Sequence, residues 1–161
     1  MAVLTVRLYG DPVLRQVATP VREITAEIKR TIADMTETMW HQVGIGLAAP
    51  QVGLPHRILV MDDGNGGAQA LINPVIENRS GTIREEEGCL SLPGVFGMVE
   101  RTKTITVRAM DADGKPVSLE ATGLKARIVQ HELDHLDGVL MLERTDDESR
   151  KDALATLRKT I

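Results

Sequence analysis

The clearest chemical signal is the pentapeptide His131-Glu132-Leu133-Asp134-His135. On a helix, residues four positions apart project to the same side, so both imidazoles can reach one metal ion. Glu132 then lies beside that metal, where a carboxylate can accept and donate protons. An exposed polar helix face would show the same letters, but the neighbouring Ile128 and Val129 predict a buried helix whose polar groups need partners. A metal ion supplies such a partner.

Two histidines leave a catalytic metal site one protein ligand short, because such sites usually take three protein ligands and keep one position for water. Cys89 is the only cysteine, and it lies in the segment 85–93, where a glycine precedes it and a proline follows. His41, His56 and the nearby acidic residues are alternative ligands, and a lone cysteine is often a small buried hydrophobe. A thiolate ligand favours iron, zinc, nickel or cobalt over magnesium or calcium.

The first elements that must position these groups follow local signals. Thr25 is suited to cap a helix, and the segment 44–53 contains glycines and a proline that predict a loop or a short extended edge. Residues 57–61 and 70–76 are predicted strands, the second interrupted at Pro74. A stripe of apolar residues at three- and four-residue spacing begins just before Thr25 and continues along this helix: Ile24, Ile28, Ile32, Met35 and Met39.

Later elements complete the predicted fold. Alternating residues at 103–110, followed by Asp113-Gly114 and the segment 116–119, predict an antiparallel hairpin. Gly123 precedes the histidine-bearing helix, and the form of a capping box at Thr145 predicts a final helix. We therefore expect an α+β fold in one domain, residues 1–161, with antiparallel strands packed around the histidine-bearing helix and the N- and C-terminal helices outside.

Composition excludes several classes of function. The formal net charge is −4 and aromatic residues make up 2% of the chain, so neither a basic face nor stacking platforms for nucleic acids are expected. Residues 1–9 lack the pattern of an export signal, and no apolar run approaches the length of a membrane span. The single cysteine fits a reducing compartment. We expect a cytoplasmic protein without DNA or membrane partners.

Three segments resemble the signature motifs of the peptide deformylase family, in the family's order. They are residues 44–51 (GIGLAAPQ), 87–91 (EGCLS) and 130–138 (QHELDHLDG). The similarity extends to the early segment 11–15 and to the predicted hairpin. It implies a peptide deformylase-like fold and hydrolysis of the N-formyl group from the N-terminal methionine of new polypeptides, with release of formate.

The resemblance also implies residue roles. Cys89, His131 and His135 would bind one divalent metal, which relatives commonly use as Fe²⁺ in cells, with Zn²⁺, Ni²⁺ or Co²⁺ as alternatives. Glu132 would be the catalytic acid and base, while Gln51 and the backbone N–H of Leu90 would stabilise the oxyanion. An inactive or altered-specificity paralogue and a metallopeptidase with the His-Glu-x-x-His arrangement are the alternative functions.

Substrate contacts are implied in the same way. Gly44, Ile45 and Gly46 would form a backbone edge to which the peptide adds as a strand, with Gly88 as a further contact. Leu124 and Ile128, together with Ile45 and the His131 ring, would surround the methionine side chain, although both are also ordinary core positions. Phe96 departs from many relatives, which carry a polar arginine or tyrosine there. The ribosome near the exit tunnel is a candidate partner through basic residues of the final helix, for which a solvated face is the favoured interpretation: Arg150, Lys151, Arg158 and Lys159.

Overall fold

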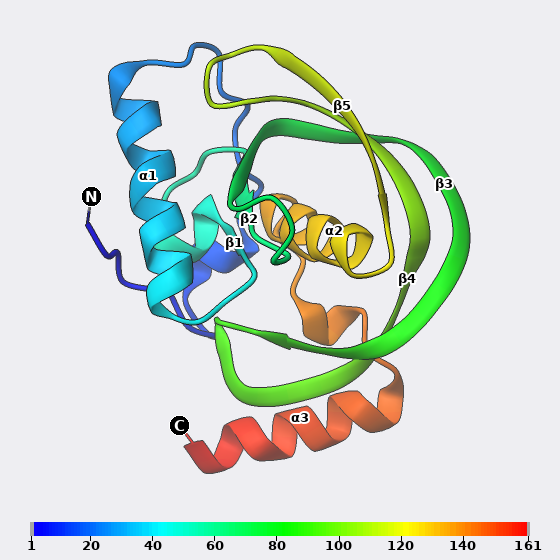
Figure 1. Ribbon diagram of the computed structural model, residues 1–161. Helices are drawn as coiled ribbons and strands as arrows, with labels where there is room; N and C mark the ends of the chain where they lie inside the picture. The colour runs from blue at the N-terminus through cyan, green and yellow to red at the C-terminus, as the bar shows by residue number, and fades with distance from the viewer. Residues whose placement is uncertain (1, 161) are drawn as a thin grey trace.

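The computed structural model describes residues 2–160, which form one antiparallel sheet with one helix inside its curve and two outside (Figure 1). The α-helices of this part of the chain are α1 (Ala26–His41), α2 (Leu124–Leu136) and α3 (Asp147–Thr160). The strands are β1 (Gly46–Ala48), β2 (Ile58–Met61), β3 (Gln69–Cys89), β4 (Leu92–Met110) and β5 (Pro116–Thr122). Short 3-10 turns are η1 (Pro12–Arg15), η2 (Ala49–Val52) and η3 (Met141–Glu143).

The strands follow the order β1-β2-β3-β4-β5, and each neighbouring pair is antiparallel. The long strands β3 and β4 curve around α2, while α1 lies beside β1 and β2 and α3 lies outside the β3–β4 ribbon (Figure 1). This arrangement confirms the predicted α+β fold, with antiparallel strands around the helix that carries His131 and His135. No helix within residues 2–160 is long and apolar enough to cross a membrane.

Helix α2 is held in the core by its apolar residues. Ile128, Val129 and Leu136 belong to one buried cluster that also contains Leu59 of β2 and Val107 of β4. Burying an aliphatic side chain of this size contributes about 1.5–3 kcal/mol relative to leaving it exposed. The polar side chains of the same helix are carried into the interior with this face, so they must find partners in the protein or in a ligand.

The extent of β3 and β4 was underestimated from the sequence. The strand predicted at 70–76 continues to Cys89, and the strand predicted at 103–110 begins at Leu92. Most residues of β3 between 77 and 86 are exposed, so this stretch lacks the apolar alternation that marks a half-buried strand. Pro74 does not end β3 because the ladder to β4 shifts register between Ile72 and Val75. An irregular position of this kind tolerates the missing N–H of proline.

The N-terminal cap of α1 is the one expected from the sequence, whereas the cap of α3 differs from the expected one. The Thr25 side chain accepts a hydrogen bond from the N–H of Ile28, as expected for the cap of α1. At α3 the expected capping box at Thr145 is not formed. Asp146 accepts from the N–H of Ser149 instead, and the Thr145 hydroxyl donates to the carbonyl of Leu142. An acidic side chain is favoured at this end of a helix because the N–H groups there carry partial positive charge.

Candidate metal centre and active site

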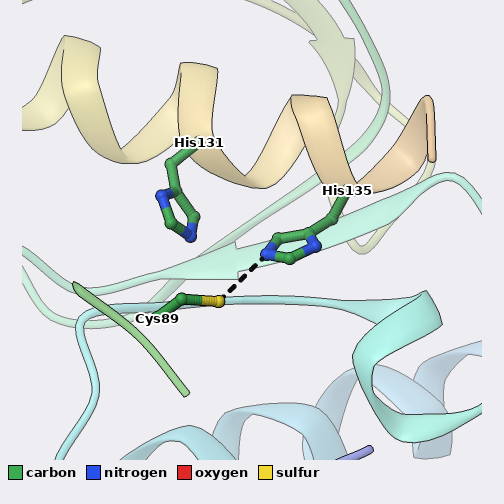
Figure 2. Close-up of side chains that lie close together, drawn as sticks. All are labelled: Cys89, His131 and His135. Atoms are coloured by element: carbon green, nitrogen blue, oxygen red, sulfur yellow. Dashed lines mark hydrogen bonds between the residues drawn. The ribbon is translucent and has the colours of Figure 1, made fainter. Parts of the chain in front are cut away.

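Three metal-ligating side chains meet at the centre of the molecule. Cys89 ends β3, and His131 and His135 lie one turn apart on α2, with their rings turned toward the sulfur (Figure 2). Their ligand atoms all lie within 4.8 Å of one another, and Cys89 Sγ is 3.3 Å from His135 Nε2. Tetrahedral bonds of ordinary length to one metal place sulfur and nitrogen donors about 3.5 Å apart. The cluster therefore fits a single divalent ion.

Electrostatics around the two imidazoles also fit a cation. Burial lowers the pKa of His131, but the negative groups Glu132, Cys89 and Glu87 outweigh it and raise that pKa well above the ordinary value. The site therefore favours positive charge beside these groups. Burial, together with the positive charges of His131 and Arg101, lowers the pKa of His135 well below its usual range. His135 is thus held neutral, which is the form that binds a metal.

A chain of charged residues fixes the orientation of His131. Glu87 Oε1 lies 2.9 Å from His131 Nδ1, so Nε2 of the same ring is left to face the cluster. Arg101 donates two hydrogen bonds of 3.0 Å to the Glu87 carboxylate and one of 2.6 Å to Asp134 Oδ2. Arg144 donates to both oxygens of Asp134. Burial would raise the pKa of Glu87, but the bonds from His131 and Arg101 lower it to about 2.

Sequence reasoning missed this chain of charges. Glu87 and Asp134 were noted only as members of motifs, and the acids near Cys89 were considered as metal ligands. In the structure Glu87 instead bonds to Nδ1 of the ligand His131, on the side of the ring away from the cluster. Arg101 gave no signal of its own because it lies in the charged run 100–103, which resembles an exposed strand face. It is nevertheless 6% exposed.

We expect Arg101→Met to destabilise the protein by about 3–5 kcal/mol, because removing one partner leaves the carboxylates of Glu87 and Asp134 buried without their main positive partner. Urea unfolding of parent and variant at the same metal content measures the difference. Arg108→Met is the matched control, since its ion pair with Glu77 is exposed. Equal unfolding midpoints for parent and Arg101→Met would show that the buried pairs contribute no net stability.

Glu132 is placed to carry protons. Its side chain is buried, and its Oε1 has no hydrogen-bond partner among the described residues. Burial is the main cause that raises the pKa of Glu132 to about 7, while the nearby charge of His131 acts in the opposite direction. A carboxyl group with a pKa in this range can take up and release a proton near neutral pH. It faces the same cleft as His131.

The cleft has a volume of about 640 Å³, and one of its walls is the edge of the sheet. The strand β1 pairs with β2 on one side and is the terminal strand of the described sheet, so its other edge has no strand partner. Glycines allow this edge to lie close to Glu132 and Leu90. A Cβ on Gly46 would lie 2.6 Å from Glu132 Oε2, and one on Gly44 would lie 2.9 Å from Leu90 Cδ1.

We expect Gly46→Ala to lower the rate of N-formyl hydrolysis, the reaction that the sequence resemblance implies, at least about tenfold. The reason is that the added methyl group displaces the Glu132 carboxylate. Metal content should stay at the parent level, because the added methyl group would meet Glu132 and Ile128 first, and neither is one of the three ligands. Gly44→Ala is the comparison variant, because its methyl group meets only the flexible end of Leu90. Equal activity of parent and Gly46→Ala would exclude a tight fit between the edge and Glu132.

Gln51 is held in one orientation beside the cluster. Its Oε1 accepts from the N–H of Ala48 at 2.9 Å, which turns Nε2 toward Ser91 Oγ at 3.2 Å and Cys89 Sγ at 3.6 Å. A fixed amide N–H is thereby presented near the metal cluster. Leu90 lines the cleft next to it. Sequence reasoning gave Ser91 no role of its own, because it appeared there only as part of the motif at residues 87–91.

The remaining predicted substrate residues also surround the cleft. Gly44, Ile45, Gly46, Gly88, Leu124 and Ile128 all line it. Ile128 is buried and Leu124 is half exposed, so the first is a core residue as well. His41 is exposed and His56 partly buried, and neither belongs to the cluster of Cys89, His131 and His135.

A Cys-His-His cluster beside a buried carboxylate in an open cleft defines a metal-dependent hydrolase. The family model described as polypeptide deformylase matches residues 3–151. This chain belongs to the polypeptide deformylase family, which confirms the family and enzyme class expected from the sequence.

Similar proteins agree with this assignment along the whole chain. The peptide deformylase of Alkalilimnicola ehrlichii is 46% identical over 164 residues, which cover 100% of this chain and 92% of that protein. The crystal structure of a peptide deformylase from Legionella pneumophila matches with a TM-score of 0.94 at 36% identity, over 99% of this chain and 95% of that one. The enzyme from Thermus thermophilus matches with a TM-score of 0.92 at 45% identity, over 98% and 94%.

Proposed function

We propose that this protein removes the N-formyl group from the N-terminal methionine of newly synthesised polypeptides and releases formate. The observation that carries the proposal is the meeting of Cys89, His131 and His135 beside Glu132, in a cleft bordered by an open strand edge. We treat residues 1–161 as one catalytic domain, which the match over 3–151 supports.

Cys89, His131 and His135 are proposed to hold one divalent metal ion. When bound, such an ion would act as a Lewis acid and would lower the pKa of water from its bulk value to about 7. We propose Fe²⁺ as the ion used in cells, with Zn²⁺, Ni²⁺ or Co²⁺ able to take its place, because a thiolate with two imidazoles suits these metals better than magnesium or calcium. A thiolate ligand also makes the site sensitive to oxidation.

Side chains and backbone groups of the protein carry out proton transfer and stabilise the oxyanion. Glu132 accepts the proton of the attacking water and then delivers it to the departing amine, so the peptide leaves with a free amino terminus. The attack places negative charge on the formyl oxygen. The Nε2–H of Gln51 and the N–H of Leu90 donate to this oxyanion, and each such preorganised donor is worth about 3 kcal/mol of barrier.

The substrate is proposed to bind as an added strand. Its backbone pairs with the edge formed by Gly44, Ile45 and Gly46, while Gly88, which lines the same cleft, is a further contact. The methionine side chain enters the apolar part of the cleft beside Leu124 and Ile128. Binding through main-chain hydrogen bonds suits a substrate whose sequence varies after the methionine.

Nascent polypeptides are made in the cytoplasm, and we place the protein there because its single cysteine fits a reducing compartment. Lys151, Arg158 and Lys159 are exposed on α3 and are available to contact the ribosome near the exit tunnel. DNA and membranes are not proposed as partners.

The experiment that tests this function compares formyl-Met-Ala-Ser with an N-acetylated, internally quenched peptide at equal concentrations of nickel-loaded protein. We expect formate release from the first peptide and no cleavage of the second. Cleavage of the acetylated peptide would indicate an endopeptidase, and binding of metal without action on either peptide would indicate an inactive paralogue.

A further inference from the structure

An irregular segment early in the chain connects two of the motifs that carry the chemistry. The N–H of Arg7 donates to the backbone carbonyl of Gln51 at 2.6 Å, and the N–H of Tyr9 donates to the backbone carbonyl of Ser91 at 2.9 Å. Gln51 ends the motif at 44–51, and Ser91 ends the motif at 87–91. We call residues 7–9 the brace segment. The reaction proposed above gives this segment no role.

The brace segment closes a ring of hydrogen bonds that includes the side chain of Gln51. The Nε2–H of Gln51 donates to Ser91 Oγ at 3.2 Å, and both residues are buried. The ring therefore passes from Arg7 to Gln51, from Gln51 to Ser91, and from Ser91 back to Tyr9. The amide in this ring is the proposed oxyanion donor, so its position depends on where the brace segment holds the two backbone carbonyls.

Two further hydrogen bonds anchor the chain on either side of the brace segment. The N–H of Leu4 donates to Oγ1 of Thr38 on α1 at 2.8 Å, and the N–H of Ala18 donates to the carbonyl of Leu136 on α2 at 2.8 Å. Thr38 and Ala18 are both buried. A segment tied to two core helices in this way is a fixed connection, unlike the loosely held ends of many domains.

A turn leaves the N–H of Tyr9 available for Ser91. The N–H of Asp11 donates to the carbonyl of Leu8 at 3.0 Å, and Gly10 has a φ of +102°. This bond, with a positive φ at the third residue, is the pattern of a type II turn, in which the second residue does not use its N–H inside the turn. Proline is common at that second position, which here is Tyr9.

Resting on the proposed function, in which Gln51 stabilises the oxyanion, we propose that the brace segment is a positioning element for this donor. None of its residues lines the cleft or belongs to the metal cluster in the described part of the chain, so it acts through Gln51 and Ser91. A shift of about 1 Å in a catalytic group can cost about 10²-fold in rate. Loss of one of the two backbone bonds should therefore slow the chemical step and leave the binding of peptide and metal unchanged.

The test removes the N–H of Tyr9 and keeps the turn. Tyr9→Pro deletes the donor at a position where proline fits, whereas Tyr9→Ala deletes the same side chain and keeps the donor. With nickel-loaded protein and formyl-Met-Ala-Ser, we expect the kcat of the proline variant to be at least about fivefold below that of the alanine variant. The two variants should share the same KM and metal content. Equal kcat values overturn the proposal.

A second background shows whether the loss passes through Gln51. Gln51→Ala alone should lower kcat about 10²-fold, as expected for the loss of one oxyanion donor. In the Gln51→Ala protein, Tyr9→Pro should cost less than about twofold, because the donor that the brace segment positions is gone. A loss by the same factor on both backgrounds indicates general structural damage and overturns the proposal. Parent-level kcat in Gln51→Ala also overturns it, since no donor would then need positioning.

Gly10 offers an independent pair of variants, which decides the matter if Tyr9→Pro does not fold. A Cβ added at Gly10 meets no atom within 4 Å, so any effect reaches Gln51 through the backbone. Valine is strained at a positive φ, whereas asparagine is tolerated there. We expect kcat to fall in Gly10→Val, to return toward the parent value in Gly10→Asn, and to show no such difference on the Gln51→Ala background. Equal kcat for the two Gly10 variants refutes the positioning role.

Outcomes for the brace segment and for the proposed function are separable. Formate release by the parent, with equal kcat for Tyr9→Pro and Tyr9→Ala, refutes the positioning role alone. Failure of the metal-loaded parent to release formate from formyl-Met-Ala-Ser refutes the proposed function itself.

Discussion

Glu132→Ala is expected to lower formate release from formyl-Met-Ala-Ser at least about 10³-fold while one metal ion per chain stays bound. General acid and base catalysis contributes about 10²–10⁴-fold, and Glu132 is proposed to act both as base and as acid. The three ligands are unchanged by the substitution, so metal affinity should be retained. Metal analysis after gel filtration and a formate assay on the same sample give both values.

Two further variants make this result specific to the carboxylate at position 132. Glu132→Gln keeps the size of the side chain but cannot accept a proton, so it should fall as far as the alanine variant. Glu148→Ala removes an exposed carboxylate at the start of α3 and should keep parent activity. Rapid turnover by Glu132→Gln with full metal content would rule out Glu132 as the proton carrier.

Cys89→Ala and His135→Ala are expected to lose both the metal and the activity. Structural sites with four ligands are worth about 10–16 kcal/mol, so one ligand accounts for roughly 3 kcal/mol, or more than a hundredfold in metal affinity. Competition with a fluorescent chelator measures the affinity of each variant. His41→Ala controls for the loss of any histidine, because His41 is exposed and outside the cluster.

The ligand assignment requires that each of these variants binds the ion more weakly than the parent. If Cys89→Ala binds the ion as tightly as the parent, Cys89 is not a ligand, and the third protein donor has to be sought among the neighbouring carboxylates. Glu87 would then be the first alternative, although it already bonds to His131 and Arg101.

Local sequence patterns were sufficient to predict the parts of the fold that local interactions determine. The cap at Thr25 and the apolar stripe of α1 repeat at helical spacing, so they are visible in any short window. The burial of α2 was predicted for the same reason, from Ile128 and Val129. Exposed β3 residues between 77 and 86 carry no such pattern, because their pairing with β4 is made by the backbone.

The candidate site could be predicted only as far as its residue types allowed. The motif around His131 and His135 pointed to a metal, and the structure brings Cys89 to it from another element. The support behind His131 was not predictable, because it joins residues 14, 33 and 44 positions apart across two strands and a helix. Such contacts depend on strand register, which the sequence does not state in any local pattern.

The most direct measurement is formate release from formyl-Met-Ala-Ser by protein purified without oxygen and loaded stepwise with Fe²⁺. We expect the rate to rise in proportion to bound iron and to level off at one ion per chain, with one free methionine amino terminus formed per formate. Full occupancy of the site without formate release would contradict the proposal that this centre hydrolyses the formyl group.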